Sequence, residues 1–150
     1  MEFLIGYVLI AVILLFMGFE LVQIGMFTLA LIGVFIVLIG VFFALCVVLL
    51  IMSRPASAVF IKFDEERKFP VAVYKINGED VPNMFPSEMI MRDKIYVPNK
   101  EIRLLYCKPR RAAIDKNALI TMITGSVIFI PGGVFSAIAL VEFVKGFFVH

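Results

Sequence analysis

The sequence contains one histidine, two cysteines and no tryptophan. His150 is the last residue, and a catalytic or metal-binding histidine needs neighbours that fix its ring. Cys46 lies in an apolar run and Cys107 in a charged one, which predicts two different environments and no disulfide. No Cys/His spacing typical of zinc sites and no phosphate-binding glycine loop occurs. We therefore expect no catalytic residues, no bound metal and no cofactor.

Charge is nearly absent from the first third of the chain. Residues 1–52 carry only Glu2 and Glu20, whereas 13 of the 14 Lys and Arg lie between Arg54 and Lys116. With 62% hydrophobic and 17% charged residues, the chain is more apolar than soluble domains usually are. This distribution predicts a multi-pass membrane protein of the α+β class, with a charged domain between apolar helices.

Three uncharged stretches predict three transmembrane helices. Residues 3–19 and 24–52 are expected to form a helical hairpin that occupies 1–52. The second helix would be about 44 Å long, which exceeds a hydrocarbon core of about 30 Å and requires tilt or projection.

The third apolar stretch, within residues 118–150, contains Pro131-Gly132-Gly133. Proline and glycine are tolerated in membrane helices, but they free backbone groups that need other partners. We expect one helix kinked at Pro131–Gly133 and followed by an interfacial tail. The alternative is a helix that ends near Ile130 and continues as a re-entrant or interfacial segment.

Residues 53–117 change to the pattern of a small antiparallel β domain, either a twisted sheet or a partly open barrel. Asn77-Gly78 between two runs rich in β-branched and aromatic residues is a strong hairpin signal. We expect about five strands, at 57–63, 70–76, from 79, 91–97 and 102–107. Alternate residues should be buried, namely Phe60, Val71, Val73, Ile95 and Leu104.

Four basic residues close to the third helix are the best candidate functional feature: Lys108, Arg110, Arg111 and Lys116. Basic residues beside a membrane helix attract anionic lipid headgroups, and they also act simply as determinants of topology. By the positive-inside rule, the β domain and the N-terminus should face the cytoplasm and the C-terminus the opposite side of the inner membrane. The modest excess of positive charge does not indicate nucleic acid as a partner.

Two further features lie in the hairpin. Glu20 and Gln23 interrupt the apolar sequence and either cap the turn or form an intramembrane polar site. Small residues recur on one face of the second helix, at Ala30, Gly33, Gly40 and Ala44. Such a stripe packs against another helix of the same chain or against a second copy.

Three segments carry a resemblance to a family: 70–79 with its Asn-Gly turn, Glu101 to Pro109, and Ala112 to Asp115 before a helix. Over about residues 56–140 the chain resembles an uncharacterised family of small membrane proteins with a β-rich segment between transmembrane helices. The resemblance implies architecture, since the activity of that family is itself unknown. The chain differs from the family pattern at Cys107-Lys108, which precede Pro109.

These observations predict a non-enzymatic, integral membrane protein that serves as an accessory, assembly or regulatory subunit. Membrane lipids and another membrane protein or a second copy are the expected partners. The hypothesis also relies on exposed strand edges, which a small sheet usually presents. The alternative is a small transporter, channel or immunity-type membrane protein that uses Glu20.

Overall fold

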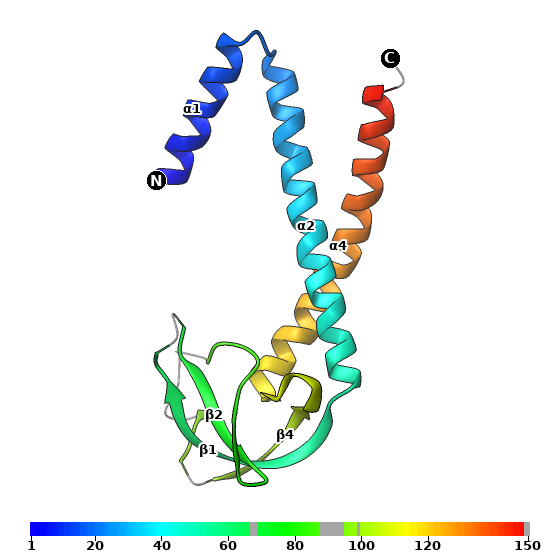
Figure 1. Ribbon diagram of the computed structural model, residues 1–150. Coiled ribbons are helices and arrows are strands. Elements are labelled where there is room, and N and C mark those ends of the chain that lie inside the picture. Colours follow the sequence, from blue (N-terminus) through cyan, green and yellow to red (C-terminus); the bar gives the residue numbers. More distant parts are fainter. Residues whose placement is uncertain (67–68, 88–94, 99, 149–150) are drawn as a thin grey trace. The chain divides into compact units, whose positions relative to one another are not determined.

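The computed structural model describes residues 1–66, 69–87, 95–98 and 100–148 (Figure 1). It forms two compact units, one of Met1–Val41 with Pro131–His150 and one of Phe42–Ile130. Its helices are α1 (Glu2–Phe16), α2 (Leu21–Ile51), α4 (Lys116–Phe148) and the short 3₁₀ helix η1 (Lys108–Arg110). Its strands are β1 (Arg54–Asp64), β2 (Val71–Ile76), β3 (Glu79–Pro82), β4 (Glu101–Cys107) and β5 (Ala112–Ile114). The predicted α+β class, with an antiparallel sheet between the second and third long helices, is confirmed.

The turn between α1 and α2 is built from a glycine stop and a capped start. Gly18 adopts a φ of 92°, which favours glycine, and ends α1. Its N–H donates to the Leu15 carbonyl at 3.0 Å, and the Phe19 N–H donates to the Leu14 carbonyl at 3.1 Å. This pair of bonds is a Schellman motif. It ends the helix three residues earlier than the uncharged run to 19 suggests.

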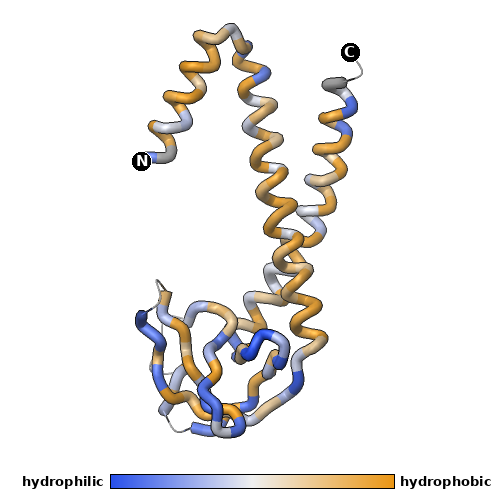
Figure 2. The backbone as a smooth tube through the Cα atoms, viewed as in Figure 1, coloured by the Kyte–Doolittle hydropathy of each residue, from blue (hydrophilic) through white to orange (hydrophobic). Residues whose placement is uncertain are grey.

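Two helices, α2 and α4, are long and apolar enough to cross a membrane. In Figure 2 the backbone of α2 has the colour of hydrophobic residues along most of its length. The prediction of three transmembrane helices is not matched, because α1 has only 15 residues. A helix of that length rises about 22 Å, less than a hydrocarbon core of about 30 Å.

α4 continues through Pro131 as one helix. On one side of this proline, within the unit that contains the N-terminus, glycines bring α2 and α4 close together. A Cβ placed on Gly133 would lie 3.3 Å from the Cα of Gly40, and one placed on Gly33 would lie 3.4 Å from the Cγ of Leu140. The absence of a side chain at these positions therefore permits close packing of the two helices.

The five strands form one sheet in the order β3-β2-β1-β4-β5, with antiparallel neighbours (Figure 1). The sheet curves into a half-barrel and brings the end of β3 to β5. Asn83 forms a parallel bridge with Ala113, and the Met84 N–H donates to the Ala113 carbonyl at 2.8 Å. The expectation of exposed strand edges is therefore wrong at this one point, where a single bridge joins the residue after β3 to β5; β3 and β5 remain the edge strands of the sheet.

Most of the strand predictions are confirmed. β1 contains 57–63, β2 begins one residue after Pro70, and Asn77-Gly78 forms the hairpin turn with positive φ at both residues. The predicted strand 91–97 is wrong in its described part, 95–97, and residues 91–94 lie outside the described residues. The fifth strand of the sheet is β5 instead.

The core of the sheet is rich in aromatic residues. Phe60, Val71, Val73 and Leu104 are buried as predicted, but the alternation is wrong in β2, where Ala72 and Tyr74 are buried as well and belong to the core cluster with Phe60 and Leu104. Ile95 is 42% exposed, whereas its neighbour Tyr96 is 4% exposed. The Tyr96 ring packs against Phe60 and Phe63. Ile95 was assigned to the core by strand alternation, and without a strand that alternation does not hold.

Candidate functional site

The most polar buried site of the β domain is centred on Asp115, the residue between β5 and α4. Its Oδ2 accepts hydrogen bonds from the Tyr74 hydroxyl at 2.8 Å, from Asn83 Nδ2 at 3.0 Å and from the Tyr96 hydroxyl at 3.5 Å. Its Oδ1 accepts from the Ala118 N–H at 2.8 Å, which makes Asp115 the N-cap of α4. One carboxylate thus joins β2, the end of β3 and the start of a helix.

Both oxygens of this carboxylate accept hydrogen bonds from neighbouring groups. Three side-chain donors share one oxygen and a backbone N–H occupies the other. Asn83 is also satisfied, because its Oδ1 accepts from the Asp115 N–H at 3.3 Å and its Nδ2 donates to the Phe85 carbonyl at 3.3 Å. Burial, and then the negative charge of Asp115, raise the pKa of Tyr74 well above its usual range. The tyrosine therefore stays a neutral donor.

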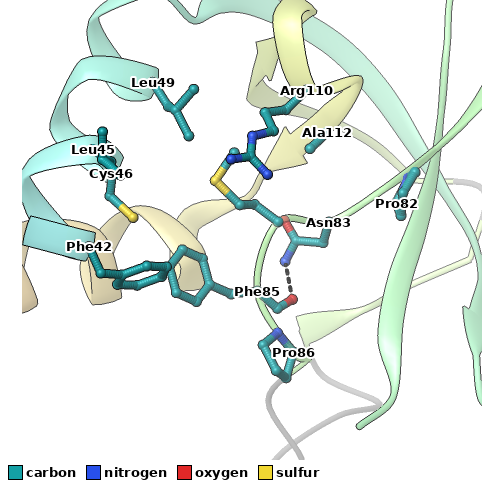
Figure 3. Close-up of a pocket in the computed structure, with 11 residues that line it drawn as sticks. Phe42, Leu45, Cys46, Leu49, Pro82, Asn83, Phe85, Pro86, Arg110 and Ala112 are labelled. Carbon is teal, nitrogen blue, oxygen red and sulfur yellow. Dashed lines mark hydrogen bonds between the residues drawn. The ribbon is translucent and has the colours of Figure 1, made fainter. Parts of the chain in front are cut away.

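Beside α2, the unit of residues 42–130 contains a cavity of about 560 Å³ (Figure 3). One wall is the face of α2 that carries Phe42, Leu45, Cys46 and Leu49. The other is formed by residues after β3 and around η1: Pro82, Asn83, Met84, Phe85, Pro86, Arg110 and Ala112. In Figure 3 the guanidinium of Arg110 extends from its loop towards the α2 wall. The cavity is thus mainly apolar with one cation.

The four basic residues predicted to contact lipid are Lys108, Arg110, Arg111 and Lys116. All four are exposed. Lys108 and Arg110 belong to η1, Arg111 follows it, and Lys116 is the first residue of α4. None has an ion-pair partner within the part of the chain that the structure describes. They differ in one respect, since only Arg110 of the four lines the cavity. Whether they bind lipid stays a prediction.

Glu20 and Gln23 meet at the start of α2. The Gln23 Oε1 accepts a hydrogen bond from the Glu20 backbone N–H at 3.0 Å. This is one half of a capping box, with Glu20 at the N-cap position and Gln23 three residues later. Glu20 and Gln23 therefore cap the turn, which is one of the two alternatives, and the intramembrane polar site stays a prediction.

The small residues of α2 do not all face the same way. Gly33 and Gly40 approach α4 within the unit that holds the N-terminus. Ala30 is half-buried and lines a groove with Gly33, whereas Ala44 is exposed. Phe43 occupies the neighbouring buried position instead, where its ring stacks on Phe129 with centroids 5.4 Å apart. The pairing is within one chain, and a seam between copies stays a prediction.

The prediction that the two cysteines lie in different environments is wrong. Cys46 and Cys107 belong to the same buried apolar cluster, which also contains Ile114, Ala118 and Met122. The cluster forms because β4 and β5 pack against the end of α2 and the start of α4. Both thiols are free and buried. Among the described residues no group of three or more His, Cys, Asp or Glu is placed to hold a metal ion.

Sequence reasoning missed the role of Asp115. An Asp shortly before an apolar run, here followed by Lys116 and Asn117, is a helix N-cap signal and could have located the start of α4. Its partners Tyr74 and Asn83 are 41 and 32 positions away, so no local pattern links them.

Comparison of the chain with protein-family models, with curated proteins and with solved structures found no match.

Proposed function

We propose that the chain is an integral membrane protein anchored by α2 and α4, whose β domain acts as a non-enzymatic contact module of a membrane assembly. The observation that carries the proposal is the exposed apolar surface of the helices. In the most apolar 18-residue stretch, 11% of α2 and 6% of α4 is buried. A core helix of a soluble protein would bury these residues, and exposing them to water would be costly. Lipid would cover them.

The position of the basic residues supports attachment of the domain to an anionic surface. Arg54 begins β1 directly after α2 and pairs across the sheet with Tyr106, next to the end of β4. Four more cations, Lys108, Arg110, Arg111 and Lys116, lie where the chain passes from β4 to α4. Each Lys or Arg near an anionic membrane contributes about 1 kcal/mol. Five cations of the domain thus lie at the end where α2 finishes and α4 begins.

The orientation follows from the same residues. By the positive-inside rule, the β domain faces the cytoplasm and the C-terminus lies on the opposite side of the cell's inner membrane. For the N-terminus to share the cytoplasmic side, α1 would have to cross the bilayer. Its length allows this only where the hydrocarbon core is thinned to about 22 Å.

The role of an accessory, assembly or regulatory subunit is supported by how the domain uses its polar groups. The buried carboxylate of Asp115 has hydrogen-bond donors on both oxygens, and these donors tie strands to a helix. Its chemistry is therefore used to hold the domain in shape. The partner is another membrane protein or a second copy of this chain, and anionic lipids complete the contact surface.

The experiment that tests the proposal is crosslinking in intact cells, followed by membrane fractionation. A photo-crosslinking residue at Ile61, exposed on β1, should capture a partner, and the protein should remain in the membrane after alkaline carbonate extraction. Ala72, buried in β2, is the matched position for a crosslinker that should capture nothing. Release by carbonate would refute membrane anchoring. A protein that stays in the membrane as a monomer, without capture from Ile61 or other exposed positions of the domain, would refute the role as a subunit.

A further inference from the structure

The α2 wall of the cavity is a continuous apolar face. The face begins at Phe42 and continues three, four and seven residues later, at Leu45, Cys46 and Leu49. Residues at these spacings lie on one side of a helix. This face extends for about 10 Å along the axis. Phe85 adds a second apolar ring, 6.4 Å from the ring of Phe42 and roughly perpendicular to it. An extended hydrocarbon chain fits this surface.

The opposite wall contributes a single available charge. Arg110 makes no ion pair or hydrogen bond within the described part of the chain, and its guanidinium extends towards Leu49 and Cys46 (Figure 3). The amide of Asn83, the other polar side chain of the wall, already bonds to Asp115 and to the Phe85 carbonyl. Arg110 is therefore the polar group of the wall that is free to bind a ligand, and its charge requires an anionic one.

The combination of one cation and a long apolar wall favours the phosphate of a phospholipid over a free phosphate ion. A free phosphate ion would gain nothing from the α2 face and would leave it uncovered. A phospholipid satisfies both parts, because its phosphate pairs with guanidinium while an acyl chain covers apolar surface. The cations Lys108, Arg111 and Lys116 next to the cavity favour a headgroup with net negative charge.

We propose that this cavity binds one anionic phospholipid, with its phosphate on Arg110 and an acyl chain along Phe42, Leu45 and Leu49. The proposal rests on the proposed function, since the membrane around α2 supplies the lipid. It differs from general attraction of the basic residues to a charged surface, because it assigns a specific role to Arg110. It also makes a lipid molecule part of the wall between a membrane helix and the β domain.

The test is titration of the purified full-length protein with phosphatidylglycerol, with bound lipid counted by native mass spectrometry. The wild-type protein should retain one phosphatidylglycerol in preference to phosphatidylcholine. Arg110→Gln should weaken binding about tenfold, the loss expected for one charge-assisted hydrogen bond. Arg111→Gln is the matched control, because Arg111 is exposed on the same loop but does not line the cavity. It should weaken binding by less than about twofold.

A second variant tests the acyl chain. Leu45 is 57% exposed, so Leu45→Trp should leave the fold intact while it fills the cavity, and it should lower lipid occupancy to a similar degree as Arg110→Gln. Equal losses in the Arg110 and Arg111 variants would overturn the proposal in favour of non-specific surface attraction. Displacement of the lipid by soluble glycerol phosphate would identify a site for free phosphate instead. Unchanged binding in the Leu45 variant would exclude the acyl chain from the cavity.

These outcomes are separable from failure of the proposed function. If the protein resists carbonate extraction and is crosslinked to a partner, but Arg110→Gln retains its lipid, only the lipid site is wrong. If carbonate releases the protein, the membrane assignment itself fails.

Discussion

The ring of Phe43 in α2 occupies the space that a Cβ on Gly125 in α4 would need, with its Cε1 and Cζ atoms in the overlap. Both residues lie in the unit of residues 42–130, and Gly125 is buried. The adjacent Ser126 hydroxyl lies 3.5 Å from the Phe43 carbonyl oxygen and donates to the Met122 carbonyl at 2.6 Å. The glycine thus sets how closely an aromatic ring of one helix approaches the backbone of the other.

Gly125→Ala should therefore destabilise the protein. The added methyl group meets an aromatic ring that also stacks on Phe129, and overpacking of this kind costs about 1–3 kcal/mol. Thermal unfolding of the detergent-solubilised protein measures the effect. Gly25→Ala is the control, because a Cβ at Gly25 meets nothing within 4 Å. A Gly125 variant as stable as the Gly25 variant would contradict close packing of Phe43 on Gly125.

The contact between Gly133 and Gly40 predicts a graded response. A Cβ on Gly133 lies 3.3 Å from backbone, whereas one on Gly132 lies 3.7 Å from a side-chain methyl of Ile36. Gly133→Val should lower the melting temperature because the backbone of α2 cannot yield as a side chain can. Gly132→Ala, an ordinary van der Waals contact, should leave it nearly unchanged. The reverse order of the two melting temperatures would place the close contact elsewhere.

Asp115→Ala should destabilise the β domain more than Tyr74→Phe does. It removes the N-cap of α4, a loss of about 1 kcal/mol, and leaves the Tyr74 hydroxyl without its acceptor, at about 1–3 kcal/mol, while Asn83 Nδ2 keeps only its bond to the Phe85 carbonyl. Tyr74→Phe removes one donor and should cost about 1 kcal/mol. Chemical denaturation of both variants would show whether the loss follows this order.

Tyr74 also predicts how stability depends on pH. Its pKa in the folded protein is raised, so above about pH 10 the unfolded chain releases this proton while the folded protein retains it. The unfolded state then binds fewer protons, and the free energy of unfolding falls as pH rises through this range. Below about pH 10 the tyrosine has no such effect. Tyr74→Phe should flatten the alkaline decrease, and an unchanged slope would show that another group is responsible.

Glu20→Gln separates the two functional hypotheses. Its backbone N–H is bound by the Gln23 side chain, a contact that the substitution leaves intact, so expression and stability should not change. A contact module should retain its partner in this variant. A transporter or channel that uses Glu20 would lose activity while the protein remains folded. Gln23→Ala is the matched variant for the turn itself, and it should destabilise the start of α2.

The orientation can be measured with an introduced cysteine. Cys46 and Cys107 are 3% and 0% exposed, so neither should react with a membrane-impermeant maleimide in the folded protein. Ser57→Cys, exposed on β1, should be labelled only after the cells are permeabilised. Labelling of Ser57→Cys in intact cells would reverse the predicted topology.

How much of this fold could be predicted depended on how local each signal is. The hairpin at Asn77-Gly78 and the strands on either side of it follow from adjacent residues, because turn chemistry and alternation act over short distances. β5 has three residues, Ala112–Ile114, whose extended conformation is explained by pairing with β4 rather than by propensity. Such pairing cannot be derived from three residues alone.

The candidate site divides in the same way. The exposure of the four cations between 108 and 116 could be predicted from their charge. The position of Arg110 in the cavity wall could not, because the cavity also depends on α2 and on the segment after β3, which are far away in the sequence. The shared cluster of Cys46 and Cys107 was likewise hidden, because 60 residues separate the two and only the packing of α2 against β4 brings them together. The carboxylate of Asp115 gathers its partners in the same non-local manner.

The position of Asp115 at the last strand has a consequence for biosynthesis. The segments that supply Tyr74, Asn83 and Tyr96 leave the ribosome before their common acceptor does, and β5 and the start of α4 follow β4 in the same order. A nascent chain that stops before residue 112 lacks β5 and the acceptor to which the Tyr74 and Asn83 side chains donate. Completion of the β domain therefore waits for the segment that leads into the second long apolar helix. Asp115 itself precedes α4, so the acceptor of these donors is present before the apolar part of that helix is synthesised.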